Sequence, residues 1–173
     1  MDSINRNQPE HNHEDLAGPN AVKRIKDMVE DAKSCFFESR GADVRPMSVL
    51  DVDEAGNLWF LSAADSHKNV EVAADAKVRL YFQASKHSGF LYLDGMATIS
   101  RDKAKISELW SPELKTWFTE GEDDPRITVI KVAPTGGYYW DNKHGNFVAG
   151  IKIMVGAAIG KTLDDSIEGR VQP

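Results

Sequence analysis

Three consecutive residues, Ser66, His67 and Lys68, could bind an anion together. They follow the apolar stretch Trp59–Ser62 and a short turn of small residues. Ser66 is suited to cap a helix, because its side-chain oxygen can accept a hydrogen bond from a backbone N–H two or three residues later. The free N–H groups and the dipole at a helix start favour an anion, and Lys68 adds a full positive charge. The pattern predicts either a phosphate site or a surface turn in which Ser66 only caps the helix.

Arg45 is a second candidate for the same anion. It lies in a strand expected over Val44–Val52, where the alternation of side chains places Arg45, Met47 and Val49 on one face. Pro46 donates no backbone hydrogen bond, so it suits an edge position or the opening of a strand. From this strand the side chain of Arg45 could reach an anion held at the helix start.

The rest of the chain is expected to form short strands separated by turns, with few helices. The expected strands cover 34–38, 44–52, 58–62, 77–83, 90–100 and 126–132, and a turn at Pro134–Gly137 leads into Tyr138–Trp140. The expected helices begin at an Asn20 cap, after Ser66, at Ser100 and at Ser111–Pro112, and a further one covers 151–159. Gly95, inside the longest strand, indicates a bulge or the close approach of another backbone.

Six or seven short strands with helices at the periphery predict a mainly β (α+β) fold built as a closed antiparallel barrel. Residues 1–18 are polar and are expected to form a disordered tail, residues 19–150 the domain, and residues 151–173 a helix followed by a loose tail. Trp110, Leu114, Trp117 and Phe118 have helical spacing, which favours packing in a core or between subunits over contact with a cofactor.

Composition restricts the function. The net charge of −6 argues against general binding to nucleic acids or anionic membranes, so any phosphate site must be local. The single cysteine, Cys35, excludes an internal disulfide and is expected to be buried. His11 and His13 lack further fixed ligands nearby, so no metal site is expected. With neither a signal peptide nor a long apolar segment evident, we expect a cytoplasmic protein.

Several motifs in order resemble the pyridoxamine 5'-phosphate oxidase-like FMN-binding split barrels, and most closely their general stress protein subgroup. The motifs are Arg45-Pro46-Met47, Trp59-Phe60-Leu61-Ser62, Ser66-His67-Lys68, Val78-Arg79-Leu80-Tyr81-Phe82 and Leu91-Tyr92-Leu93-Asp94-Gly95. The resemblance covers about residues 20 to 150. It implies a six- to seven-stranded antiparallel split β-barrel over 19–150 that binds FMN. The cofactor-binding residues that it implies are Arg45, Pro46, Met47, Phe60, Leu61, Ser62, Ser66, His67, Lys68 and Trp140.

The resemblance also implies a role for each part of this set. Arg45, Ser66 and Lys68 would hold the FMN phosphate, and the backbone at Leu61 and Ser62 would contact the flavin. His67 stands where the oxidases usually carry an arginine. The relatives also imply a homodimer with the flavin at the subunit interface, to which the Trp110–Phe118 aromatics would contribute. Trp140 would either cover the flavin of the partner subunit or plug one end of its own barrel.

Two functions remain open for such a protein. It is expected to be either an FMN-dependent reductase that uses reduced nicotinamide, or a stress module that holds a flavin without turnover. A split barrel that uses the deazaflavin F420 or haem is a further alternative. Oxidation of pyridoxamine phosphate is not expected, because the C-terminal arginine and histidine pattern of the oxidases is not visible here. No catalytic residue is assigned from the sequence.

Overall fold

The computed structural model describes residues 11–39, 42–84, 89–142 and 166–173, and its strands form one nine-stranded sheet. The strands are β1 (Leu16–Ala17), β2 (Ser34–Ser39), β3 (Arg45–Ser48), β4 (Asp51–Val52), β5 (Leu58–Ala63), β6 (Lys77–Gln83), β7 (Phe90–Ser100), β8 (Ile127–Asn142) and β9 (Ser166–Gln172). The helices are α1 (Pro19–Ala32), α2 (His67–Ala74) and α3 (Lys103–Leu109), with 3₁₀ turns η1 (Pro112–Thr116) and η2 (Gly121–Asp123).

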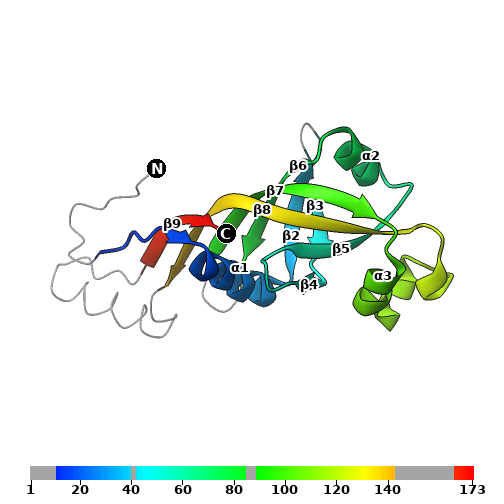
Figure 1. Ribbon diagram of the computed structural model, residues 1–173, viewed down its shortest axis with the longest axis horizontal. Coiled ribbons are helices and arrows are strands. Elements are labelled where there is room, and N and C mark those ends of the chain that lie inside the picture. The colour runs from blue at the N-terminus through cyan, green and yellow to red at the C-terminus, as the bar shows by residue number, and fades with distance from the viewer. Residues whose placement is uncertain (1–10, 40–41, 85–88, 143–165) are drawn as a thin grey trace.

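The strand order is β1-β9-β8-β7-β6-β2-β3, and β5 pairs with both β4 and β8. All pairs are antiparallel except β1 with β9, which is parallel. The predicted mainly β class with peripheral helices is therefore confirmed. The sheet is mixed and not closed, which corrects the expectation of a closed, purely antiparallel barrel. The long strands β7 and β8 connect the region of α1 to the region of α3 (Figure 1).

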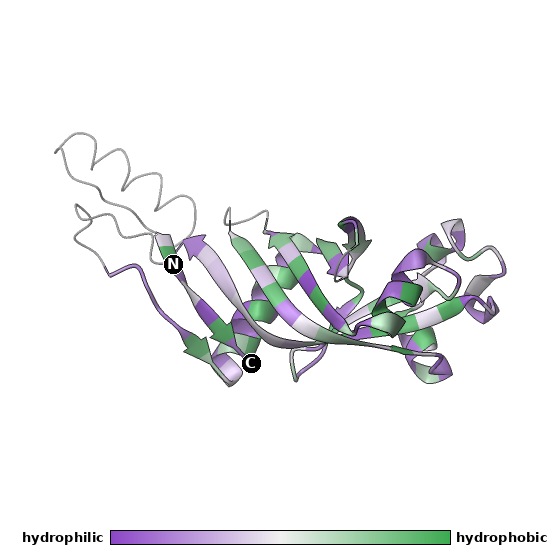
Figure 2. Cartoon of the chain, turned by 90° about the horizontal axis from the view of Figure 1, so that it is seen from above, coloured by the Kyte–Doolittle hydropathy of each residue, from purple (hydrophilic) through white to green (hydrophobic). Residues whose placement is uncertain are grey.

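Two apolar clusters hold the fold together. The larger one lies between α1 and the sheet and includes Ile25, Phe37, Leu80 and Tyr139. The smaller one, which includes Ile106 and Phe118, joins α3 and η1 to the start of β8. Strand residues alternate between the core and the opposite sheet face, and the central strands accordingly carry alternating hydrophobic and hydrophilic bands (Figure 2).

Both ends of the described chain form strands where tails without regular structure were expected. Leu16–Ala17 pairs with β9, and the backbone N–H of Glu14 donates to the carbonyl of Glu168 at 2.8 Å, so the described part of the expected tail, residues 11–18, is ordered against β9. Residues 1–10 of that expected tail lie outside the described residues. Likewise Ser166–Gln172 is a strand rather than a loose tail. A polar sequence can still form a strand when a neighbouring strand satisfies its backbone. The helix expected at 151–159 lies outside the described residues.

Strand β8 is the largest difference from the expected elements. It continues through Pro134–Gly137, where a turn was expected, and pairs with β7 and β9. A Cβ on Gly137 would stand 2.1 Å from the carbonyl oxygen of Tyr92, so the glycine marks a close strand contact here. The bulge predicted at Gly95 is confirmed, because the register between β7 and β8 shifts between Asp94 and Gly95.

Helix boundaries also differ in detail. Gly18, not Asn20, precedes the first turn of α1, and Asp102, not Ser100, caps α3 by accepting from two backbone N–H groups. The expected burial of Cys35 is confirmed, and burial raises the pKa of its thiol to about 12. None of the helices in the described ranges has the length and apolar character needed to cross a lipid bilayer.

Candidate functional site

The turn from β5 into α2 has the structure that the sequence predicts. The hydroxyl of Ser66 accepts a hydrogen bond from the backbone N–H of Asn69 at 3.3 Å, so Ser66 is the N-cap of α2. Helix α2 then begins at His67. The cap leaves the first backbone N–H groups of α2 at the end of β5, together with the side chain of Lys68.

A buried polar network fixes this turn against β8. The hydroxyl of Ser62 donates to the side-chain oxygen of Asn69 at 2.7 Å, and the Asn69 amide donates to the Thr128 hydroxyl at 2.8 Å. The Thr128 hydroxyl in turn donates to the carbonyl of Ser62 at 2.8 Å. Because all three residues are buried and each side chain has a partner, the network holds β5, α2 and β8 in one arrangement.

A cavity of about 350 Å³ opens beside this turn. We call it the cradle pocket; its lining residues are Pro46, Met47, Ser48, Leu50, Leu61, Ser62, Ala63, Ser66, Lys68, Leu114, Trp117 and Phe118. The residues from β3, β5 and the start of α2 form one wall, and the residues around η1 form the other. Its volume falls within the roughly 300–1,000 Å³ typical of sites for small molecules. The lining thus combines the cation Lys68 with apolar and aromatic side chains.

Lys68 is the cation of the cradle pocket. Its side chain is half-buried, and among the described residues no group forms a hydrogen bond or ion pair with its ammonium. Burial lowers the pKa of Lys68 below its ordinary value, the nearby charge of Arg45 lowers it further, and Glu71 partly opposes this. A bound anion would therefore relieve an unfavourable charge at this position.

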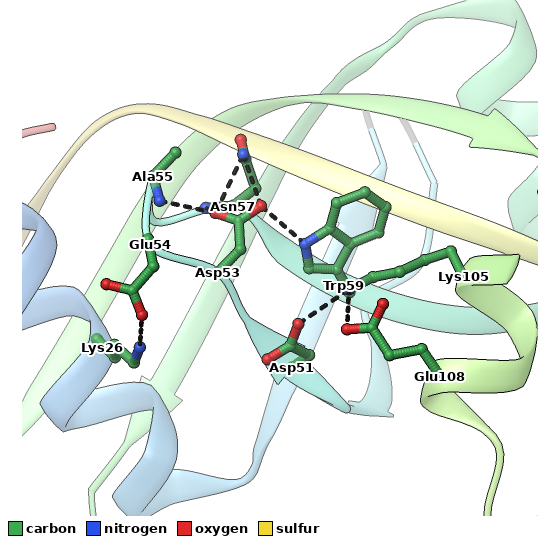
Figure 3. A network of polar contacts seen from close by, with 9 residues as sticks. All are labelled: Lys26, Asp51, Asp53, Glu54, Ala55, Asn57, Trp59, Lys105 and Glu108. Atoms are coloured by element: carbon green, nitrogen blue, oxygen red, sulfur yellow. Dashed lines mark hydrogen bonds and ion pairs between the residues drawn. The ribbon is translucent and has the colours of Figure 1, made fainter.

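Helix α3, which precedes the η1 wall of the pocket in the chain, is attached to the sheet through Trp59 and Lys105. The indole N–H of Trp59 donates to Asp53 at 3.0 Å, and the ammonium of Lys105 lies 4.4 Å from the centre of the indole ring (Figure 3). Lys105 also donates to Asp51 at 3.0 Å and Glu108 at 2.8 Å, which joins α3 to β4. These contacts fix α3 at the N-terminal side of the η1 wall.

The other end of this wall is held by Arg126 and Asp124. The guanidinium of Arg126 donates to the buried carboxylate of Asp124 at 2.7 Å and to the carbonyl of Trp117 at 3.3 Å. The backbone of Trp117 is therefore fixed, while its indole is 65% exposed at the pocket. An exposed indole on a fixed backbone can pack against a flat ligand without reorganising the fold.

The structure brings six of the ten residues implied for the cofactor together in the cradle pocket. They are Pro46, Met47, Leu61, Ser62, Ser66 and Lys68. Arg45 is adjacent to the site, but its guanidinium is paired with Glu71. His67 is exposed at the first position of α2. Phe60 is fully buried and packs edge-to-face on Phe37, so its side chain belongs to the core.

Trp140 lies far from the cradle pocket of its own chain. It stands near the end of β8, twelve residues after Thr128, which corresponds to roughly 40 Å along a strand. It is 41% exposed, and its ring centre lies 4.6 Å from that of Tyr138. Tyr139, its neighbour, faces the core, so Trp140 does not fill the barrel interior. Within one chain, Trp140 therefore lies outside the cradle pocket.

Sequence reasoning missed several residues of the site. Asn69 and Thr128 are polar residues on otherwise apolar faces, a signal that could have indicated a buried network. Trp110 and Phe118 were expected at a subunit interface, yet both pack in the smaller cluster, and Phe118 is only 4% exposed. Of these aromatics, Trp117 alone is strongly exposed, so the expected interface role is wrong for Phe118.

Comparison with known proteins agrees with this fold. Protein bli-3 of Neurospora crassa is 26% identical over 104 residues, or 55% of this chain and 50% of that protein. The chain thus spans about half the length of this curated relative. A Jannaschia sp. CCS1 structure named after general stress protein 26 has 24% identity and a TM-score of 0.76, with coverage of 90% of this chain and 100% of that one.

The general stress FMN/FAD binding protein of Xanthomonas citri has 21% identity and a TM-score of 0.61, with coverage of 70% of this chain and 87% of that one. Both structural likenesses show the fold, a split barrel as expected. Residues 20–164 match the family described as pyridoxamine 5'-phosphate oxidase like. Because this match covers most of the 173 residues, the chain belongs to the pyridoxamine 5'-phosphate oxidase like family.

Proposed function

We propose that this protein is an FMN-binding flavoprotein of the general stress type that holds the cofactor in the cradle pocket. The observation that carries the proposal is the composition of that pocket, which combines a half-buried lysine beside a helix start with apolar and aromatic side chains from the η1 region. The resemblance to a general stress FMN/FAD binding protein supports it. None of the described residues lining the pocket is a histidine, which argues against the haem alternative.

Different residues of the pocket bind the phosphate and the flavin ring. Ser66, Lys68 and the free N–H groups of α2 bind the phosphate, because a charged donor beside a helix start favours an anion. The backbone at Leu61 and Ser62 orients the ring, and Leu114 and Trp117 cover it and exclude water. FMN, when bound, supplies the capacity to accept a hydride. We further propose that reduced nicotinamide is the hydride donor, which makes the protein a reductase.

The protein is also proposed to be a homodimer with the flavin at the subunit interface. The outer aromatic face, which consists of Phe36, Tyr81, Phe90, Tyr92 and Trp140, supports this. Phe36, Tyr81 and Tyr92 are directly opposite one another on β2, β6 and β7. Exposed aromatic residues of this kind are enriched at permanent interfaces. Such an interface would allow Trp140 of one subunit to approach the cradle pocket of the other.

Reconstitution with FMN followed by absorption spectroscopy tests the proposal. The expected result is a bound flavin spectrum that bleaches when reduced nicotinamide is added and recovers under air. Stable binding without bleaching by NADH or NADPH would identify a module that holds the flavin without turnover. A protein that leaves the spectrum of FMN unchanged, and retains none after gel filtration, would contradict the assignment.

A further inference from the structure

Glu71 holds the arginine that was expected to bind the phosphate. The two terminal nitrogens of Arg45 each lie 3.0 Å from a carboxylate oxygen of Glu71, so the pair is bidentate. The buried hydroxyl of Ser39 donates to the same carboxylate. Arg45 also donates to the carbonyl of Asp43, at 3.1 and 3.2 Å. The Glu71 carboxylate is thus fixed beside Arg45.

The same carboxylate belongs to the electrostatic environment of the cradle pocket. Glu71 follows Lys68 by three residues on α2, which places the two on neighbouring turns. Its charge raises the pKa of Lys68, whereas Arg45 lowers it. Hydrogen bonds from Arg45 and Ser39, together with the charge of Arg45, lower the pKa of Glu71. Glu71 is therefore ionised at neutral pH, between the cations of the site.

We infer that Glu71 is a specificity-determining residue, which limits the preference of the pocket for phosphorylated over unphosphorylated flavin by neutralising Arg45. The inference rests on the proposed flavin function. Arg45, which is adjacent to the site, already donates N–H groups to Glu71 and to the carbonyl of Asp43, so it has less to offer a phosphate bound at Lys68. The phosphate also meets the negative charge of Glu71 itself. The phosphate gains less from the site than the two cations alone would offer.

A positioning role for Glu71 makes the opposite prediction. If the carboxylate oriented Arg45 toward the phosphate, removing its charge would weaken FMN binding. If it competes with the phosphate, removing its charge strengthens that binding. Glu71→Gln separates the two, because glutamine keeps the shape and can accept from Arg45 without the charge.

Asp94→Asn is the matched control. Asp94 also forms a bidentate pair with an arginine, Arg79, at 2.7 and 2.8 Å. This pair joins β6 to β7, and neither residue lines the cradle pocket. Both variants therefore raise the net charge of the protein by one unit and remove the negative charge from a similar pair. The difference is that Glu71 lies near Lys68 on α2, whereas Asp94 lies on β7, outside the cradle pocket.

The experiment titrates FMN and riboflavin into wild type, Glu71→Gln and Asp94→Asn. In Glu71→Gln, FMN binding should become about tenfold tighter, the low end of what one charge-assisted hydrogen bond contributes. Riboflavin affinity should change less than about twofold, so the preference for FMN should rise about tenfold. Asp94→Asn should leave this preference unchanged. Weaker FMN binding, or an unchanged preference, in Glu71→Gln overturns the inference.

The same titrations also test the proposed function itself, through the binding of flavin by wild type. If wild type binds neither flavin, that function is wrong, and the role of Glu71 is then decided with inorganic phosphate. Amide NMR shifts of residues 66–69 would report its binding. Tighter phosphate binding in Glu71→Gln than in wild type would support the competition. Equal binding, or no phosphate binding by either protein, would overturn it.

Discussion

At the scale of single residues, the two cations at the cradle pocket, Lys68 and Arg45, differ in whether a carboxylate neutralises them. Among the described residues, half-buried Lys68 has no counter-ion within bonding reach, whereas the charge of nearby Arg45 is matched by Glu71. Sequence reasoning treated the two cations as equivalent phosphate ligands. In the structure only Arg45 of these two has a carboxylate partner among the described residues.

Lys68→Ala should therefore weaken FMN binding by roughly ten- to a hundredfold, because a charge-assisted bond contributes about 1.5–3 kcal/mol and about 1.4 kcal/mol is tenfold in affinity. His67→Ala should cost less, since a neutral imidazole forms a weaker bond. Titration of the apoproteins measures both effects. Lys77→Ala, which removes an exposed lysine of β6 outside the pocket, is the control for net charge. Equal affinity in Lys68→Ala and Lys77→Ala would remove Lys68 from the site.

At the scale of elements, the segment from α3 to the start of β8 carries some side chains that pack in the core and one that is exposed at the pocket. Phe118 and Ile106 pack in the smaller cluster, while the indole of Trp117 is left at the pocket. The spacing of the aromatic residues predicts one apolar helical face. A 3₁₀ turn at Pro112–Thr116 instead separates the residues into core and pocket positions.

Trp117→Ala should weaken FMN binding by roughly two- to tenfold, since an aromatic contact contributes about 0.5–1.5 kcal/mol beyond burial. Emission per bound flavin should rise, because a nearby indole quenches excited flavin, and Trp117→Phe should retain most of the affinity. The melting temperature should change little, since the side chain is 65% exposed. In contrast, Phe118→Ala should destabilise the fold by about 3–5 kcal/mol. Unchanged affinity and emission in Trp117→Ala would exclude the contact.

The turn from η2 into β8 should respond to acid through Asp124. Hydrogen bonds from Arg126 lower the pKa of its carboxyl from 3.8 to about 2. A pKa that is lower in the folded state stabilises the fold above the unfolded pKa, so this contribution is complete above about pH 4 and disappears toward about pH 2. Asp124→Asn should therefore differ from wild type in melting temperature near pH 6, and the difference should shrink between about pH 4 and 2. Asp123→Asn, at an exposed neighbour, is the control. A constant difference across this range would contradict the prediction.

At the scale of the whole molecule, the distance between Trp140 and the cradle pocket makes the oligomeric state decisive. Within one chain the two belong to different ends of β8. The exposed aromatics across β2, β6 and β7 lie on one sheet face, where a second copy could cover them. A complete site of the proposed kind would need both subunits.

Light scattering should give a mass of about twice 19.2 kDa for the protein at micromolar concentration. Phe36→Glu should shift the protein toward the monomer, because it places a charge on the outer aromatic face. Val44→Glu changes a similarly exposed apolar residue that is not on β2, β6, β7 or β8, the strands of the outer aromatic face, and should leave the dimer intact. A monomeric wild type that still binds FMN would rule out the shared site.

Trp140→Ala provides a further test of that arrangement. If Trp140 covers the flavin of the partner subunit, the variant should remain dimeric, bind FMN more weakly and show brighter emission per bound flavin. Its melting temperature should change little, because the side chain is 41% exposed. Emission equal to that of wild type would exclude the role. The comparison with Trp117→Ala shows which indole lies closer to the ring.

The sequence by itself determined the features that depend on neighbouring residues. Alternation of side chains predicts β6 residue by residue, and the Ser66 cap follows from a hydroxyl placed three residues before a free N–H. Only the tertiary structure decided the pairing of Arg45 with Glu71, 26 residues apart, and of Asn69 with Thr128, 59 residues apart. It also decided that Pro134–Gly137 continues β8, because strand partners on both sides supply the backbone contacts that these residues alone do not favour. Such contacts depend on sheet register, and register is set by packing between segments that are distant in sequence.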